Sequence, residues 1–322
     1  MYNHAYKARV MTKNATNTLM MVRPVAFTLN EQTAVDNFYQ KKGTSEQNAQ
    51  KLAGEEFDGF VKNLRAQGVL VEVLEDTLKP HTPDSIFPNN WISMHEDGRI
   101  ALYPMKAENR RLERRTDIYE ELERRGYEIG STIDYTASEN EERYLEGTGS
   151  MVLDHDAKIA YLAKSQRADE GLFRIFCKDF DYTPVVFTAY QNTPDGIGKI
   201  YHTNVMMCVT DKYVLVCLDT IHDSIERAGV ETAIRNSGKQ VLEISVAQKS
   251  NFAGNMLLVK GTANQLILVM SSSAYSSLTA KQIDFIQQYH TILHSDLHTI
   301  ETLGGGSARC MLAEIYLTKR HK

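Results

Sequence analysis

The chain has 322 residues, of which 42% are hydrophobic and 24% charged, as in a globular protein with a sizeable buried core. The net charge of −5 and the pI of about 6.1 argue against a nucleic-acid partner, because such a partner needs clustered lysine and arginine on a basic domain. No stretch approaches the roughly 18 apolar residues of a membrane span. The four cysteines show neither CxxC nor disulfide-ladder spacing, so we expect free thiols and a cytoplasmic location.

The N-terminal residues 1–18 are basic, carry no acid and lack the apolar core of a secretion signal, so we expect them to be disordered. No low-complexity linker interrupts the rest of the chain, and one domain over residues 1–322 is predicted. The basic run 110–115 includes an acid and is predicted to be the solvated face of a helix.

Hydrophobic periodicity predicts strands that alternate with helices. The predicted strands are residues 20–27, 69–74, 100–103, 127–134, 151–153, 159–163, 185–189, 204–209, 213–218, 240–245, 255–259 and 266–270. The predicted helices are residues 47–67, 107–125, 168–180, 224–237 and 279–288. The recurring order is strand, strand, helix, strand, with a period of roughly 50 to 60 residues. A repeat of this size favours a closed, propeller-like α/β array over a doubly wound sheet.

Four polar or glycine-rich segments lie at strand ends, where a rigid scaffold commonly places functional groups. They are residues 83–91, 145–149, 201–204 and 303–311. The last segment has three consecutive glycines before Cys310, so its backbone can approach a ligand closely and aim N–H groups at an anion, with Gly306 as the candidate donor. Arg309 beside the thiol would favour the thiolate. An inert buried cysteine after a flexible turn is the alternative.

Three further residues in these segments are candidates for acid–base or charge roles. His202 is the candidate acid–base group, since histidine titrates near neutral pH, and Glu146 and Asp84 are the candidate carboxylates. Each alone is equally compatible with a structural histidine or an acidic turn. The spacing of His290, His294 and His298 would suit a metal on one helical face. However, this segment is predicted to leave the helix and no glutamate accompanies the pair, so we predict no metal.

Taken together, these segments resemble the amidinotransferase and arginine deiminase superfamily, the guanidine-modifying enzymes or penteins. The closing glycine run and nucleophilic cysteine of that superfamily resemble residues 304–311. Its Glu-Gly-Gly-Asp, His-x-Asp and Asp-x-x-Phe motifs resemble residues 146–149, 202–204 and 84–87, in the same order along nearly the whole chain. The resemblance implies a five-bladed α/β propeller of ββαβ units with pseudo-fivefold symmetry, a single catalytic domain, and neither a metal nor an organic cofactor.

The resemblance also implies site roles. Cys310 would be the nucleophile, His202 the proton shuttle, and Glu146 and Asp84 carboxylates around a planar CN₃ group. Where the superfamily has a third carboxylate, this chain has Asn204. An asparagine N–H can donate to a carbonyl oxygen, so the change favours a neutral ureido group and is similar to the citrulline-utilising hydrolase branch.

The sequence therefore predicts hydrolysis of citrulline to ornithine, ammonia and carbon dioxide through a covalent Cys310 intermediate. The alternatives are an arginine or methylarginine deiminase-type hydrolase, an amidinotransferase, and a binding protein on the same scaffold. The predicted partner is a small guanidino or ureido amino acid. The sequence leaves open whether the chain forms a homo-oligomer. The ends of that substrate have four candidate contacts, namely Arg23, Asn89, Asn90 and Asn255.

Overall fold

The computed structural model describes residues 12–41 and 46–320, which form a mixed α/β fold. Its helices are α1 (Glu31–Ala34), α2 (Glu46–Ala66), α3 (Glu108–Arg111), α4 (Ile118–Arg124), α5 (Gly147–Ser150), α6 (Glu170–Asp179), α7 (Ser224–Asn236), α8 (Val246–Ser250), α9 (Ser272–Ser277) and α10 (Ala280–Gln287). Its strands are β1 (Thr18–Arg23), β2 (Leu70–Glu75), β3 (Ile92–Met94), β4 (Arg99–Leu102), β5 (Ser131–Asp134), β6 (Met151–Asp154), β7 (Ile159–Ala163), β8 (Thr183–Phe187), β9 (Tyr190–Thr193), β10 (Gly196–Lys199), β11 (Met207–Val209), β12 (Tyr213–Val216), β13 (Gln240–Glu243), β14 (Leu257–Lys260), β15 (Leu266–Ser271), β16 (Thr291–Ser295) and β17 (Ala313–Glu314).

Within the described ranges, five separate three-stranded sheets share one connectivity. In each sheet an antiparallel pair is followed by at least one helix and then by a strand parallel to the second strand. The sheet β17-β1-β2 obeys the same rule, although its first strand comes from the C-terminal end of the chain. The short hairpin β9–β10 stands apart from the repeat. The predicted α/β class is confirmed, and the arrangement around a pseudo-fivefold axis stays a prediction.

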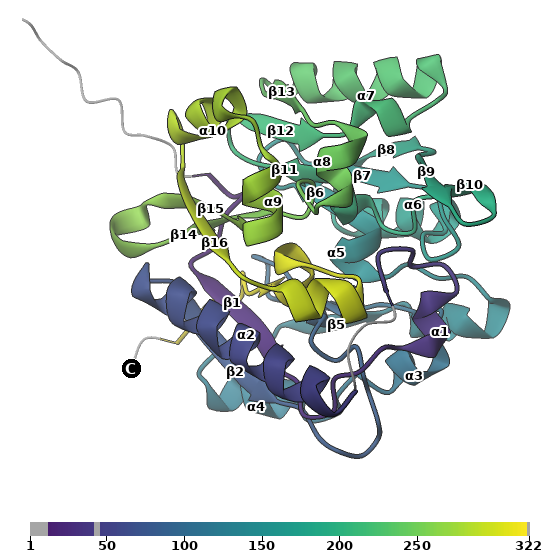
Figure 1. The fold of residues 1–322 in the computed structure, drawn as a ribbon. Coiled ribbons are helices and arrows are strands. Elements are labelled where there is room, and N and C mark those ends of the chain that lie inside the picture. The colour runs from purple at the N-terminus through teal and green to yellow at the C-terminus, as the bar shows by residue number, and fades with distance from the viewer. Residues whose placement is uncertain (1–11, 42–45, 321–322) are drawn as a thin grey trace, which may run out of the picture.

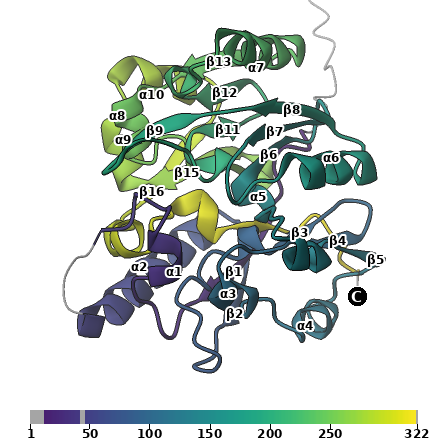
Figure 2. The ribbon, with the colours of Figure 1, turned by 90° about the vertical axis from the view of Figure 1, so that its right-hand side faces the viewer.

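The longer helices α2, α6, α7 and α10 lie on the outside of the sheets (Figures 1 and 2), and each packs against a strand of its own sheet. In α2 the buried face is formed by Phe57, Phe60 and Leu64, all at most 1% exposed. Gly68 follows α2 at φ +81°, a left-handed conformation that glycine adopts without strain. β17 near the C-terminus pairs with β1 near the N-terminus, so the two ends of the described chain meet in one sheet.

Most predicted elements occur within a few residues of their predicted bounds, but several expectations were wrong. The helix expected over 107–125 is instead two short helices, α3 and α4. The basic run 110–115 is not a fully solvated face, since Arg110 and Glu113 turn inward and are 3% and 5% exposed. The strand over 20–27 ends at Arg23. The expected disorder fails for residues 12–18, since Asn14 is buried and bonds Asp154 and the Thr210 carbonyl; residues 1–11 lie outside the described ranges.

Among the helices of the described chain, none is long and apolar enough to cross a membrane.

Candidate active site

The first strand of each three-stranded sheet is preceded by a tight turn. The five turns are Pro88–Asn90 before β3, α5 before β6, Thr203–Val205 before β11, residues 252–255 before β14 and Ala308–Met311 before β17. Because the turns occupy equivalent positions in five similar units, their side chains converge although they are far apart in sequence. Every turn except α5 carries predicted site residues within its bounds, and Glu146 lies immediately before α5.

The Cys310 thiol is buried, with 4% of the residue exposed. Two asparagine amides face its sulfur: Asn204 Nδ2 lies 3.4 Å and Asn255 Nδ2 3.2 Å from Sγ. Asn255 Oδ1 also accepts from the Arg309 backbone N–H at 3.0 Å, which fixes the amide with its N–H toward the sulfur. Both amides therefore present an N–H donor to the sulfur.

His202 and Glu146 form a buried pair, with His202 Nε2 2.8 Å from Glu146 Oε2. Burial lowers the pKa of His202, and the hydrogen bond to Glu146 opposes this only in part. Burial alone would raise the pKa of Glu146, but the charge of Arg167 and the bond to His202 hold that pKa well below its usual range. The pair is therefore a carboxylate and a neutral imidazole at pH 7, suited to proton transfer.

Two buried arginines that the sequence prediction missed line the same cavity as Cys310. Arg110 Nη1 donates to Asn90 Oδ1 at 2.8 Å, and its remaining nitrogens bond Glu113 at 2.9 Å. Arg167 bonds Asp36 and the Thr33 carbonyl, and its Nη1 lies 3.6 Å from Glu146 Oε2. Neither arginine lies in a recognisable motif. For Arg110, the one hint in the sequence is Glu113, an acid three residues later within the basic run, with which Arg110 forms an ion pair.

Asp84 is 2% exposed and lies in this cavity as well. Its Oδ2 accepts from Asn30 Nδ2 at 2.7 Å and from the Thr33 hydroxyl at 3.1 Å. Its Oδ1 is buried and has no donor among the described residues. Burial raises the pKa of Asp84, although Arg110 works against this shift. A buried carboxylate oxygen without a donor is costly, so this oxygen is available for a ligand N–H.

The side-chain amides of Asn89 and Asn90 form hydrogen bonds at one side of the cavity. Asn89 Nδ2 donates to the Thr148 hydroxyl at 3.3 Å, and Asn90 Nδ2 donates to Asn89 Oδ1 at 3.1 Å. Asn90 lines the cavity and Asn89 does not. Gly149 leaves room for this packing, since a Cβ there would lie 2.3 Å from Asn90 Nδ2 and 2.8 Å from His202 Nδ1.

The guanidinium groups of Arg23 and Arg309 bond acids away from the cavity, whereas Gly306 lines it. Arg23 sits at the end of β1 and bonds Asp58 at 2.8 Å, with a third of its side chain exposed. The Arg309 guanidinium bonds Glu314 and the Leu312 carbonyl, so its charge is already engaged away from the thiol. Gly306 does line the cavity, and a Cβ there would lie 3.2 Å from that of Cys310.

The cavity between these groups is small, with a volume of about 10 Å³. That volume holds about one water molecule, so the side chains around it must shift to admit an amino-acid substrate. Asn37 lines the cavity, and its Nδ2 donates to the Gly305 carbonyl at 3.2 Å. Tyr201 bonds the same carbonyl at 2.8 Å.

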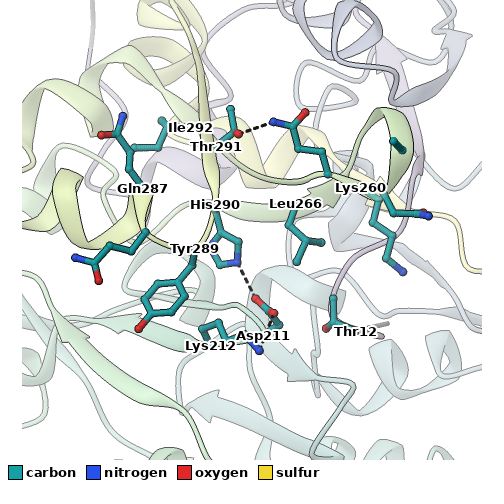
Figure 3. Close-up of a pocket in the computed structure, with 14 residues that line it drawn as sticks. Thr12, Asp211, Lys212, Lys260, Leu266, Gln287, Tyr289, His290, Thr291 and Ile292 are labelled. Atoms are coloured by element: carbon teal, nitrogen blue, oxygen red, sulfur yellow. Dashed lines mark hydrogen bonds and ion pairs between the residues drawn. The ribbon is translucent and has the colours of Figure 1, made fainter. Parts of the chain in front are cut away.

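A separate pocket of about 780 Å³ contains none of the predicted site residues (Figure 3). There His290 Nε2 lies 2.7 Å from Asp211 Oδ1, and its Nδ1 lies 2.8 Å from the Tyr213 hydroxyl. His294 instead bonds Ser272. Over the described residues, no three His, Cys, Asp or Glu side chains are grouped to hold a metal ion.

A family model described as N,N dimethylarginine dimethylhydrolase, eukaryotic, matches residues 23–317. The chain belongs to this family. It is thereby a member of the pentein superfamily. No curated protein sequence matches the chain.

Solved structures of guanidino-modifying enzymes share the fold of this dimethylhydrolase family member. The product-bound N-terminal domain of ArgZ, an arginine dihydrolase from cyanobacteria, is 15% identical with a TM-score of 0.69, covering 92% of this chain and 96% of that one. AgrE in complex with ornithine and NAD+ is 17% identical with a TM-score of 0.71, covering 95% and 40%. A dimethylarginine dimethylaminohydrolase adduct with S-methyl-L-thiocitrulline is 14% identical with a TM-score of 0.60, covering 92% and 98%. The chain spans only 40% of full-length ArgZ.

Proposed function

We propose that this dimethylhydrolase family member hydrolyses the guanidino group of a free arginine-type amino acid, arginine or a methylarginine, through a covalent bond to Cys310. One observation carries the proposal. Cys310, His202 and the carboxylate of Asp84 line one small cavity, and Glu146 holds the histidine. Nucleophile, proton carrier and orienting acid are the three parts that such a reaction needs.

The cavity offers a carboxylate oxygen to a cationic substrate. Arg110 pairs with Glu113, and Asp36 pairs with both Arg167 and Lys106. Glu146 bonds His202, and Asp84 Oδ1 lacks a donor among the described residues. A guanidinium offers positive charge and N–H donors to such oxygens. The family description and the arginine-binding neighbours point to the same class of substrate.

In the proposed mechanism, Cys310 passes its proton to His202 and the thiolate attacks the guanidinium carbon. His202 then protonates the departing amine or ammonia, while Glu146 stabilises the transient imidazolium. A water molecule next gives a proton to His202, and the resulting hydroxide attacks the thiouronium carbon. Cleavage of the carbon–sulfur bond releases citrulline and restores the enzyme. Asp84 holds the substrate N–H groups throughout.

Citrulline itself is the second candidate substrate. The two groups at Cys310 Sγ are the neutral amides of Asn204 and Asn255, and an amide N–H can donate to a ureido oxygen as a carboxylate cannot. Hydrolysis by the same route would then yield ornithine, ammonia and carbon dioxide.

A product-resolved assay tests the proposal. The purified chain is incubated with arginine, monomethylarginine, dimethylarginine, citrulline or agmatine, and amines and amino acids are quantified. We expect citrulline and the matching amine from arginine or a methylarginine. Ornithine from citrulline would select the second candidate. An arginine reaction that turns over only when glycine is added would instead identify an amidinotransferase, and inactivity toward the whole panel would contradict the proposal.

The proposal includes the architecture that positions these groups. We propose that the five sheets surround one pseudo-fivefold axis as the blades of a propeller and form a single catalytic domain. The repeated connectivity supports this, as does the origin of the site residues at equivalent turns.

A further inference from the structure

A second polar cavity lies beside the active site and holds a buried lysine. It has a volume of about 320 Å³ and is lined by side chains from the segment before α2, from β9, α8 and α9, and from the turn after β16. Lys249 is 2% exposed, and among the described residues its ammonium has a single hydrogen-bond partner, Gln191 Oε1 at 3.2 Å from Nζ. Nζ also lies 5.2 Å from the centre of the Tyr39 ring.

Lys249 is unusual because no carboxylate pairs with it anywhere in the described ranges. The other buried cations near the active site, Arg110 and Arg167, each have an acidic partner. A buried charge normally needs such a partner, since removing it from water costs several kcal/mol. Burial lowers the pKa of Lys249 to about 8, so the side chain is still mainly protonated at pH 7.

Gln191 supplies a second unsatisfied group in the same cavity. It is 8% exposed, and its Oε1 is used by Lys249, while its Nε2 is buried without an acceptor among the described residues. Glu301 also lines the cavity, but its two oxygens already accept from the Ser273 and Ser307 hydroxyls. The ammonium of Lys249 and the free amide N–H of Gln191 thus share a cavity in which the oxygens of Glu301 are already engaged by hydroxyl donors.

We propose that this cavity binds a small anion, through a carboxylate or phosphate group held by Lys249 Nζ and Gln191 Nε2. Both atoms donate to anionic oxygen, and such charge-assisted bonds are the strong ones. The cavity volume suits a small metabolite rather than a macromolecule.

Two chains of contacts connect the anion site with the segment around Cys310. Tyr39 packs edge-on against Tyr201, which bonds the Gly305 carbonyl in the active-site loop. Glu301 bonds the Ser307 hydroxyl, and the Ser307 carbonyl accepts from the Cys310 backbone N–H at 3.0 Å. Occupancy of the anion site is therefore expected to change catalytic turnover without competing with the substrate.

Calorimetric titration of the full chain with inorganic phosphate and, separately, with malonate tests the binding. Ionic strength is held constant with sodium chloride. We expect one of the two probes to bind the wild type and to bind Lys249→Met at least about tenfold more weakly, and the probe that binds distinguishes phosphate from carboxylate ligands. Lys281→Met, which removes an exposed lysine on α10, should bind like the wild type.

Gln191→Leu keeps the test decisive if Lys249→Met does not fold, since it removes the free amide N–H and should also weaken binding. Equal affinity in all variants, or no binding of either probe, would overturn the proposal. The kinetic coupling rests on the proposed function and is measured separately with the substrate identified above. An anion that lowers or raises kcat supports the coupled site, whereas strict competition with that substrate would place the anion in the catalytic cavity and refute it.

Discussion

At the scale of single residues, the sulfur of Cys310 is surrounded by amides rather than by cations. The N–H groups of Asn204 and Asn255 contact it, whereas the Arg309 guanidinium is bonded to Glu314. The sulfur therefore has no ion-pair partner among the described residues that a cationic substrate would have to displace. Positive charge in the cavity is held by Arg110 and Arg167, each tied to its own acid.

The first prediction concerns Cys310, the proposed nucleophile. Cys310→Ser should lower kcat by at least about 10⁴-fold, because a serine hydroxyl stays protonated where a thiol ionises. The melting temperature should stay close to that of the wild type, since the two side chains have similar size. Turnover is measured by amine release and folding by circular dichroism. Cys177→Ala, in α6, should retain kcat; activity in Cys310→Ser comparable to the wild type would refute the covalent route.

The buried carboxylate of Glu146 predicts a pH-dependent stability. Its pKa in the folded state lies below the unfolded value of 4.5, so its contribution is complete above pH 4.5 and is lost as the pH falls further. Glu146→Gln should therefore lower the free energy of unfolding by on the order of 3 kcal/mol at pH 7. The difference from the wild type should shrink below pH 4.5.

Urea denaturation at pH 7, 5 and 4 measures this difference. Glu141→Gln provides the control, because that carboxylate is 65% exposed in its pair with Arg143 and should change stability by less than about 0.5 kcal/mol. A gap between wild type and Glu146→Gln that is the same at every pH would contradict the assignment.

At the scale of elements, the turns before the first strands of the sheets position the candidate site residues. These turns have little room, and α5 shows it most clearly, since a Cβ at Gly149 would overlap both Asn90 and His202. The short helix α5 can therefore reach the histidine only because it carries glycine at this position.

Gly149→Ala should thus cost about 1–3 kcal/mol of stability through overpacking and reduce kcat by more than tenfold, because the imidazole must shift. Gly59→Ala is the matched control: this glycine lies in the middle of α2, and its added methyl would meet nothing within 4 Å. It should gain about 0.5–1 kcal/mol from helix propensity. Thermal unfolding and steady-state kinetics on both variants check the pair, and an undisturbed kcat in Gly149→Ala would be inconsistent with the packing described here.

At the scale of the whole molecule, the two ends of the described chain are joined in one sheet. β17 pairs with β1 through Met20 and Ala313, and the Ile315 N–H donates to the Thr18 carbonyl at 3.0 Å. Ile315 and Leu317 are also buried in the apolar cluster under β3 and β4. The last strand therefore completes the first sheet and immediately follows the turn that carries Cys310.

Deletion of residues 313–322 should abolish cooperative unfolding. Burial of Ile315 and Leu317 contributes about 1.5–3 kcal/mol each, a large part of the total stability of 5–15 kcal/mol that is typical of proteins. Scanning calorimetry tests this expectation. Lys319→Ala removes only a half-exposed ion pair with Glu72 and should cost less than about 1 kcal/mol; a sharp, wild-type-like transition in the truncated chain would argue against closure by β17.

The sequence by itself determined the α/β class, the repeated unit and the cavity residues Cys310, His202 and Asp84, because periodicity and glycine-rich turns are local signals. It did not reveal that Arg110 and Glu113 turn inward, since a basic run with an acid has the same pattern on a solvated helix. Nor did it place Arg309 and Arg23 outside the cavity. Those positions depend on which acid each guanidinium meets after folding, and such partners are brought together only by contacts between distant segments.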